Sequence, residues 1–187
     1  MPDDTRLLAA LAVIQARGAI GERSLVEAVA HADRFVELIP DGATSLVDLG
    51  SGGGLPALVI AWRRPELSVT MVERRATRAD LLRRATISLG LGEHTAVLAV
   101  DVSVVCGESP SAFDVVTARS FGDVATTTDV IDQLVAVGGV ALVSEPPTDR
   151  SDVWAAVLGA HPLLVDDGVY QGIRRLLCAE GRSSRFT

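Results

Sequence analysis

The chain of 187 residues contains no lysine, because all 17 of its basic residues are arginine. Its two cysteines, Cys106 and Cys178, form no CxxC pair, and its three histidines are far apart in the sequence. This scarcity argues against a disulfide framework and a zinc site, so we expect no metal. The longest apolar stretch near the start, residues 7–14, is shorter than the roughly 20 residues of a membrane-spanning helix. We therefore expect a soluble, cytoplasmic protein that does not enter the membrane.

Acidic residues outnumber basic ones, and the net charge of −7 argues against broad electrostatic binding of nucleic acid. The arginines are unevenly distributed, however. The segment 63–84 holds seven of them and three acids, so it carries +4 and the remainder carries −11. Two interpretations stay open for this segment, a solvated and salt-bridged helix face or a local phosphate-binding patch. Its arginines are Arg63, Arg64, Arg74, Arg75, Arg78, Arg83 and Arg84.

Hydrophobic periodicity predicts two leading helices and then strands that alternate with helices. The leading helices cover 5–17 and 24–38, the second with Ser24 as N-cap and Glu27 three residues later. Alternating strands and helices imply an α/β fold with a doubly wound, mostly parallel sheet. The expected strands are 45–49, 67–72, 95–100, 113–117 and 139–144, and the expected helices are 56–64, 76–89, 123–136 and 151–158.

The last part of the chain has a different pattern. Two apolar runs, 163–169 and 173–179, flank a Gln171-Gly172 turn, which predicts a C-terminal antiparallel hairpin that closes the sheet. No linker or repeat separates the parts of the chain. We expect residues 1–187 to form a single domain, with the helices of residues 1–40 packed on a sheet core formed by residues 41–187.

A glycine loop follows the first expected strand in "LVDLGSGGGLPALVIA", residues 46–61. In doubly wound sheets, ligands bind over this loop, where glycines allow close approach of the backbone. A phosphate-binding P-loop needs a lysine and is excluded. A serine-hydrolase elbow needs glycine two residues before the serine, where this chain has Leu49, and is also excluded. A dinucleotide fingerprint remains only in a shifted register, as Gly52, Gly54 and Ala57.

Asp48 precedes the first glycine by two residues, and the resulting D-x-G-x-G-x-G pattern resembles the first motif of class I S-adenosylmethionine-dependent methyltransferases. This resemblance implies a Rossmann-like class I methyltransferase fold with S-adenosylmethionine as cofactor. It also implies that Asp48 orients the loop and helps to hold the methionine end of the cofactor. The loop residues expected to bind the cofactor are Gly50, Ser51, Gly52 and Gly54.

Acids also close the next two strands. Glu73 ends "LSVTMVE", where the resemblance implies hydrogen bonds to the ribose hydroxyls, although a dehydrogenase would place an acid similarly. Asp101 ends "TAVLAVD" and is followed by Val102, where methyltransferases of this class often contact the adenine. The alternative interpretation of each acid is a strand-end cap or an ion pair at a helix end.

Three segments together resemble one narrower family. "DLGSGGGLP", "VERRATRADLL" and "FDVVTARSF" are similar, in order and spacing, to the RsmG (GidB) methyltransferases, which methylate N7 of a guanosine in small-subunit ribosomal RNA. The resemblance implies ribosomal RNA or the small ribosomal subunit as partner. Compared with the family pattern, Ala30 replaces an arginine, Ala57 a glycine and Ser120 an alanine, and Ser144-Glu145 replaces a lysine-glycine step. Because positive charge is lost, the cofactor prediction transfers better than the RNA prediction.

Arg119 is the predicted substrate-positioning residue, because it follows the fourth strand and a guanidinium can hold a base edge or a phosphate. Its alternative is an ion pair with an acid such as Asp123. Phe121 could stack on a base, in a chain with only 4% aromatic residues, and His31 is a packing residue or a contact. Guanine N7 carries a lone pair and no proton, so no general base is needed. Other hypotheses are a methyltransferase with a small-molecule or protein acceptor, a non-catalytic cofactor-binding domain and an NAD(P)-binding protein.

Overall fold

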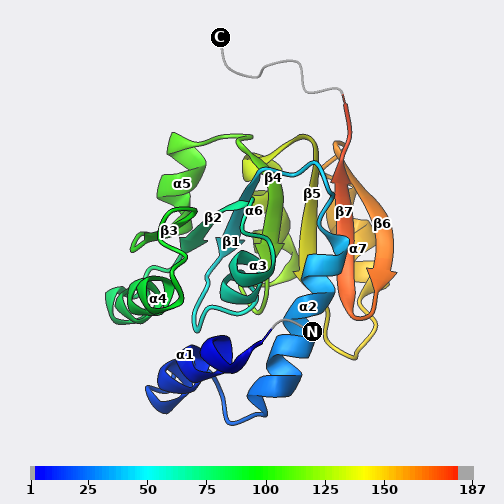
Figure 1. Cartoon of the computed structure of the whole chain (residues 1–187). Coiled ribbons are helices and arrows are strands. Elements are labelled where there is room, and N and C mark those ends of the chain that lie inside the picture. Colours follow the sequence, from blue (N-terminus) through cyan, green and yellow to red (C-terminus); the bar gives the residue numbers. More distant parts are fainter. Residues whose placement is uncertain (1–2, 181–187) are drawn as a thin grey trace.

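The computed structural model describes residues 3–180, which form a seven-stranded sheet with helices on both faces (Figure 1). The predicted α/β fold, with its mostly parallel sheet and antiparallel C-terminal hairpin, is confirmed. In chain order the elements are α1 (Thr5–Ala16), α2 (Leu25–Leu38), β1 (Ser45–Leu49), α3 (Ala57–Arg63), β2 (Ser68–Val72), α4 (Ala76–Leu89), β3 (Thr95–Leu98), α5 (Val102–Glu108), β4 (Phe113–Ala118), α6 (Val124–Leu134), β5 (Val135–Ser144), α7 (Ser151–Leu158), β6 (Leu164–Tyr170) and β7 (Ile173–Cys178).

The strand order β3-β2-β1-β4-β5-β7-β6 fixes where a ligand can bind. Strands β1 to β5 are parallel, and the direction of winding reverses between β1 and β4. At this reversal the loops after the two strands diverge and leave a crevice at the carboxyl ends. The hairpin of β6 and β7 turns at Gln171 and Gly172, whose φ angles of 51° and 82° are those of a two-residue hairpin turn.

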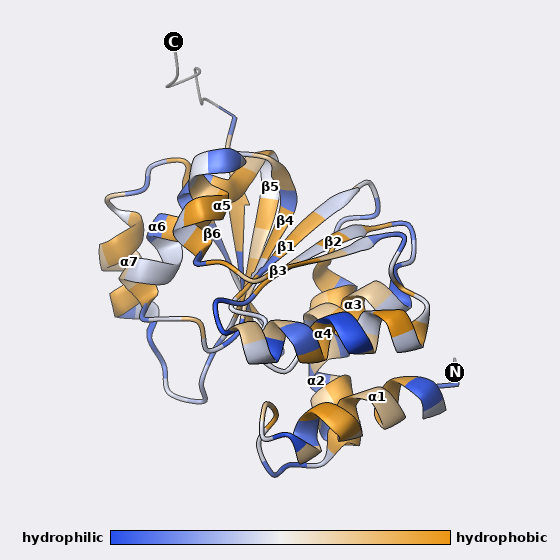
Figure 2. Ribbon diagram, turned by 90° about the vertical axis from the view of Figure 1, so that its left-hand side faces the viewer, coloured by the Kyte–Doolittle hydropathy of each residue, from blue (hydrophilic) through white to orange (hydrophobic). Residues whose placement is uncertain are grey.

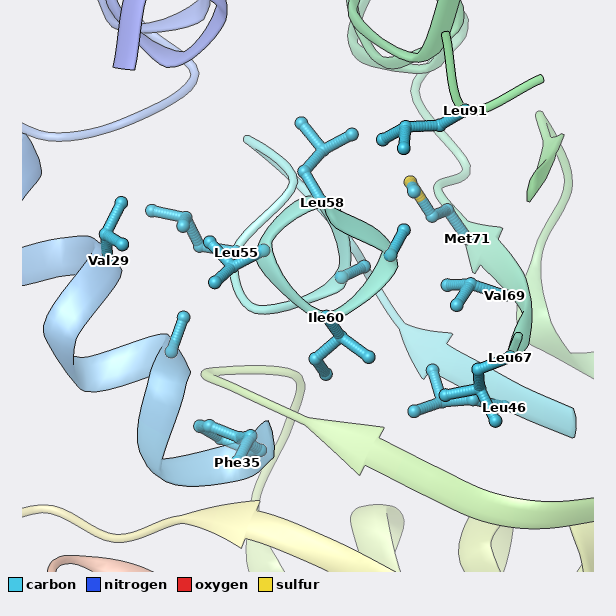
Figure 3. Packing of buried hydrophobic residues seen from close by; sticks show 14 of the residues in the cluster. Val29, Phe35, Leu46, Leu55, Leu58, Ile60, Leu67, Val69, Met71 and Leu91 are labelled. Carbon is cyan, nitrogen blue, oxygen red and sulfur yellow. The ribbon is translucent and has the colours of Figure 1, made fainter. Parts of the chain in front are cut away.

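The sheet separates two apolar clusters, because successive side chains on a strand point to opposite faces. On β1, Leu46 packs into the cluster beneath α3 and α4, whereas Val47 packs into the cluster with α5, α6 and α7. Helices α1 and α2 lie outside α3 and α4 and bury residues such as Leu11 and Phe35 in the first cluster (Figure 2). On α3, Ile60 points toward the strands, whereas Leu58 points away from them, to the side on which Leu91 lies (Figure 3).

Arg63 connects the two leading helices to α3. Its guanidinium donates to both oxygens of Asp4, at the start of α1, and its Nε donates to Asp33 of α2 at 2.9 Å. The hydrogen bond from Arg63 holds the pKa of Asp4 below its usual value. The predicted cap of α2 is present as well, since Ser24 accepts a hydrogen bond from the backbone N–H of Glu27 at 3.4 Å. Among residues 3–180, no helix is long and apolar enough to cross a bilayer.

Two elements differ from the sequence prediction. Helix α5 was not predicted, and its short valine-rich segment is stabilised as a helix by the Asp101 cap and by burial of Val105 and Cys106. The helix expected at 123–136 ends at Leu134, and β5 begins at once. A shift in the β4–β5 register lets the strand continue through Gly138, whose φ is 76°. These features depend on pairing and burial, which local periodicity does not report.

Candidate functional site

A cavity of about 420 Å³, here called the central cavity, lies at the carboxyl ends of β1 to β4. It brings together Gly50, Glu73, Asp101 and Val102, four of the residues expected to bind a cofactor. The segments that supply them are the loops after three neighbouring strands, so the sheet order determines their proximity. The full lining is Gly50, Val72, Glu73, Arg74, Arg75, Arg78, Val100, Asp101, Val102, Ser120, Phe121, Thr126 and Val130.

Asp48 lies beneath the glycine loop and is only 1% exposed. It pairs in register with Thr117 of β4, whose hydroxyl donates to Asp48 Oδ1 at 2.6 Å. Within residues 3–180, the other oxygen, Oδ2, has no hydrogen-bond partner. Burial raises the pKa of Asp48 to about 6, although the hydrogen bond from Thr117 opposes this shift. Ser51 is also buried, and its hydroxyl donates to the carbonyl oxygen of Asp48 at 3.2 Å, so both side chains shape the loop from below.

Glu73 joins the glycine loop to the start of α4. Its Oε2 accepts the backbone N–H of Gly52 at 2.9 Å, and its Oε1 accepts that of Arg75 at 2.8 Å. The residue is 5% exposed and still lines the central cavity. A carboxylate has about four acceptor positions, so two remain for a ligand. Glu73 therefore can hold the loop and a ligand hydroxyl at the same time.

Three glycines of the loop have left-handed backbone angles. The φ angles of Gly50, Gly52 and Gly54 are 63°, 55° and 85°, a region that side-chain-bearing residues rarely adopt. A methyl group built on Gly50 would lie 3.0 Å from Cδ2 of Phe121, so this ring covers the first glycine. The side chain of Phe121 therefore forms a wall of the central cavity directly above the loop.

Contacts within the protein require glycine at positions 53 and 54. A methyl group built on Gly53 would lie 2.4 Å from Cγ1 of Ile20 and 2.7 Å from the carbonyl oxygen of Ala19, in the turn between α1 and α2. On Gly54 it would lie 2.4 Å from Cδ1 of Leu58. The sequence prediction attributed the glycines to a ligand and missed the approach of the α1–α2 turn. That approach has no local signal, because the two segments are about thirty residues apart in the printed sequence.

Asp101 caps a helix and also faces the central cavity. It is the N-cap of α5 and accepts the backbone N–H of Ser103 at 3.1 Å, and it also lines the central cavity. The hydrogen bonds from Ser103 hold the pKa of Asp101 below its usual value, with a smaller contribution from the charge of Arg74. Beside it, Val102 and Val100 add apolar surface to the cavity. This end of the cavity thus offers a flat apolar wall next to a hydrogen-bond acceptor.

Arg119 lies on the other side of the glycine loop, in a second cavity of about 180 Å³ that we call the arginine cavity. No ion pair with Asp123 forms, because Asp123 caps α6 and accepts the backbone N–H of Thr126 at 2.7 Å. Ser120 next to it has a φ of 53°, which is uncommon for a residue with a side chain. The lining is Ala19, Ile20, Gly21, Arg23, Gly50, Ser51, Gly52, Gly53, Leu55, Arg78, Arg119 and Ser120.

Residues 9–152 match the model of the GidB family, described as rRNA small subunit methyltransferase G. The chain belongs to this family. It is similar to the ribosomal RNA small subunit methyltransferase G of Acidothermus cellulolyticus, at 31% identity over 86% of this chain and 69% of that protein. It is also similar to the protein of the same name from Salinispora arenicola, at 40% identity over 76% of this chain and 62% of that protein.

The match covers only part of each relative. It spans 58–69% of the length of the Acidothermus, Salinispora and Xanthomonas campestris proteins. Solved structures share the fold at lower identity. A methyltransferase from Geobacter sulfurreducens superposes with a TM-score of 0.68 at 14% identity, over 95% of this chain and 92% of that one. An O-methyltransferase family protein from Burkholderia thailandensis gives 0.60 at 16%, over 80% and 56%. These likenesses show the Rossmann-like fold.

The acid that departs from the family pattern is neutralised in the structure. Glu145 lines a third cavity, of about 280 Å³, which we call the β5 cavity. Its Oε2 accepts from Arg150 at 2.8 Å, and its Oε1 accepts from Arg174 at 3.0 Å. Arg174 is 4% exposed, also pairs with Asp166 and lies 5.1 Å above the ring of Trp154. The acid at position 145 is therefore part of a closed charge network and adds no open negative charge.

His31 reaches the same region from α2. Its Nε2 lies 3.3 Å from Oγ of Ser144, which lines the β5 cavity, and its ring packs edge-on against Phe35 at 5.9 Å. Burial, together with the charges of Arg34 and Arg23, lowers the pKa of His31. The residue thus connects α2 to the end of β5, in agreement with a packing role. Across residues 3–180, no cluster of three or more metal-ligating side chains is present.

The arginines of segment 63–84 have two different kinds of surroundings. Arg63, Arg64 and Arg83 pair with acids, as a salt-bridged surface requires. The arginines at 74, 75 and 78 instead line the central cavity. Sequence alone could not separate these groups, because the partners of the paired arginines come from residues as distant as Asp4.

Proposed function

We propose that this chain is an S-adenosylmethionine-dependent methyltransferase that acts on N7 of a guanosine in small-subunit ribosomal RNA. The observation that carries the proposal is the central cavity of a GidB family member, in which Glu73 is bonded to the glycine loop and remains accessible to a ligand. We further propose that residues 1–187 act as one methyltransferase domain and that the protein meets the small ribosomal subunit in the cytoplasm.

The donor groups around the central cavity fit S-adenosylmethionine. Val72, Val100 and Val102 provide an apolar surface for the adenine, next to the acceptor oxygens of Asp101. Glu73 has acceptor capacity for the ribose hydroxyls, and the absence of a side chain at Gly50 lets the Phe121 ring lie directly against the loop. Asp48, Ser51, Gly52 and Gly54 act by shaping the loop that would hold the methionine end. When bound, this cofactor supplies a methyl group that its sulfonium has already activated.

The remaining residues would align the acceptor. Guanine N7 presents an in-plane lone pair and no proton, so the protein needs no general base and contributes alignment and exclusion of water. Phe121 is shared by the central cavity and the β5 cavity, and its ring is placed to stack on an acceptor base. Arg119, at the end of β4, would orient the substrate. The neutralised Glu145 removes the electrostatic reason for preferring a small-molecule acceptor.

The first experiment measures the cofactor by calorimetry with S-adenosylhomocysteine. We expect binding by the unmodified protein and a loss of affinity of about tenfold or more in Glu73→Gln, because an uncharged side chain weakens the bonds to the loop and the ribose. Glu93→Gln is the matched control, since Glu93 is exposed and lies outside the cavity lining. Absence of binding by the unmodified protein, or preferential binding of NADH in competition, contradicts the proposed cofactor.

The second experiment identifies the acceptor. Purified protein and S-adenosylmethionine with a labelled methyl group are incubated with small ribosomal subunits from cells that lack the modification, and in parallel with a metabolite extract. We expect label in the ribosomal RNA, and nuclease digestion should release it as 7-methylguanosine. Label in the metabolite fraction alone would support a different acceptor, and cofactor binding without turnover on any acceptor would indicate a non-catalytic cofactor-binding domain.

A further inference from the structure

Three arginines from distant parts of the sequence converge on the arginine cavity. Arg23 comes from the turn between α1 and α2, Arg78 from α4, and Arg119 from the segment after β4. Among the described residues, no aspartate or glutamate lines this cavity. A methyl group built on Gly52 would lie 3.9 Å from Nη1 of Arg78, so this guanidinium lies against the glycine loop. Within one small cavity, a chain with a net charge of −7 thus gathers three positive charges.

These three arginines differ from six other arginines in having no acidic partner among residues 3–180. Within residues 3–180, none of the three forms an ion pair or a side-chain hydrogen bond, and none is more than partly buried. Six others do pair with a carboxylate, namely Arg63, Arg64, Arg83, Arg150, Arg174 and Arg175. A guanidinium keeps its charge at every relevant pH, so three of them in one cavity repel each other unless an anion is present. Their forked donors match the oxygens of a phosphate or a carboxylate.

Two anions could reach this position in the proposed reaction. The arginine cavity shares Gly50, Arg78 and Ser120 with the central cavity, so the carboxylate of the cofactor's methionine end lies within reach, as does a phosphate of the acceptor. The methionine carboxylate carries one negative charge and is accompanied by its own ammonium group. Three arginines exceed what that carboxylate requires, and one of them, Arg23, is exposed to solvent. A phosphodiester of a bound polynucleotide matches both features better.

We propose that Arg23, Arg78 and Arg119 bind a backbone phosphate of the acceptor polynucleotide next to the nucleotide that is methylated. This inference rests on the proposed function and adds to it the part of the protein that holds the acceptor in register. Phosphate contacts position a nucleic acid without reading its sequence, so Arg119 orients the acceptor through its backbone and leaves the base to Phe121. The α1–α2 turn becomes a functional element, held against the glycine loop by the contact between Ile20 and Gly53.

The test measures binding of a fluorescently labelled transcript of small-subunit ribosomal RNA over a series of salt concentrations. Arg23→Gln and Arg119→Gln should each weaken binding about tenfold at 0.1 M salt and reduce the slope of log affinity against log salt by about 0.7 to 0.9. Arg84→Gln is the matched control, since Arg84 is exposed on the same helix as Arg78 and does not line the cavity. The control should keep the unmodified affinity, and melting temperatures confirm that each variant is folded.

Calorimetry with two cofactor products distinguishes the two anions. S-adenosylhomocysteine carries the methionine carboxylate, whereas 5′-methylthioadenosine lacks it. We expect Arg23→Gln to leave the affinity for both unchanged. If the variants weaken S-adenosylhomocysteine alone and leave RNA binding intact, the anion is the cofactor's carboxylate and the proposal is wrong. Unchanged RNA affinity and salt slope also overturn it. Failure of the unmodified protein to methylate small subunits is a separate result, which contradicts the proposed function.

Discussion

The buried carboxyl group of Asp48 makes the stability of the protein depend on pH in a direction opposite to that of most carboxylates. Its pKa is about 6 in the folded protein and 3.8 when solvated. The raised pKa means that the folded state favours the protonated form, so stability is fully present below the unfolded pKa and decreases as pH rises through 6. A difference of about two pKa units corresponds to about 3 kcal/mol of unfolding free energy, of which roughly half is lost between pH 5 and pH 8.

The substitution Asp48→Asn removes this ionisation and keeps an oxygen that can accept the hydroxyl of Thr117. Urea denaturation of both proteins without ligand, at pH 5, 6, 7 and 8, gives the unfolding free energies. We expect the difference between unmodified protein and variant to change by about 1 kcal/mol across this range in favour of the variant at high pH. Subtracting the two curves cancels the titration of other carboxylates. A difference that stays constant within about 0.3 kcal/mol would refute the assignment of a raised pKa to Asp48.

Three further predictions concern the packing around the site. Gly53→Ala should lower the free energy of unfolding by about 1 to 3 kcal/mol in the urea assay, because the added methyl group overlaps the α1–α2 turn. Gly42→Ala is the control and should be close to neutral, because a methyl group at Gly42 would have no atom within 4 Å. Arg63→Gln should lower the free energy of unfolding by about 2 kcal/mol at pH 7. This effect should shrink below about pH 4, where the carboxylates bonded to Arg63 become protonated. Glu145→Ala should lower the free energy of unfolding by about 3 kcal/mol, because it leaves the buried Arg174 with fewer partners. An unchanged melting temperature would contradict the charge network around Glu145.

Much of the fold could be predicted because its signals are local. Ser24 caps α2 and Gln171-Gly172 turns the hairpin as predicted, since a cap or a two-residue turn depends on neighbouring backbone groups alone. Alternating apolar strands and amphipathic helices similarly implied the parallel sheet. Helix α5 and the early start of β5 were not predicted, because their conformations depend on burial and on pairing with β4.

The candidate site divides in the same way. By itself, the sequence determined that Asp48, Glu73 and Asp101 stand at the ends of three strands that follow one another in the chain, whereas the sheet order β3-β2-β1-β4 brings these strand ends side by side. Only the tertiary structure decided what each charged side chain meets. In the sequence, Glu145 looked like an added negative charge, but in the structure it is paired with two arginines. Arg119 was expected either to be paired or to be free, and no acid lines its cavity among the described residues. Ion pairs form between side chains that are distant in the sequence, so composition fixes the total charge and the fold decides where it remains available to a ligand.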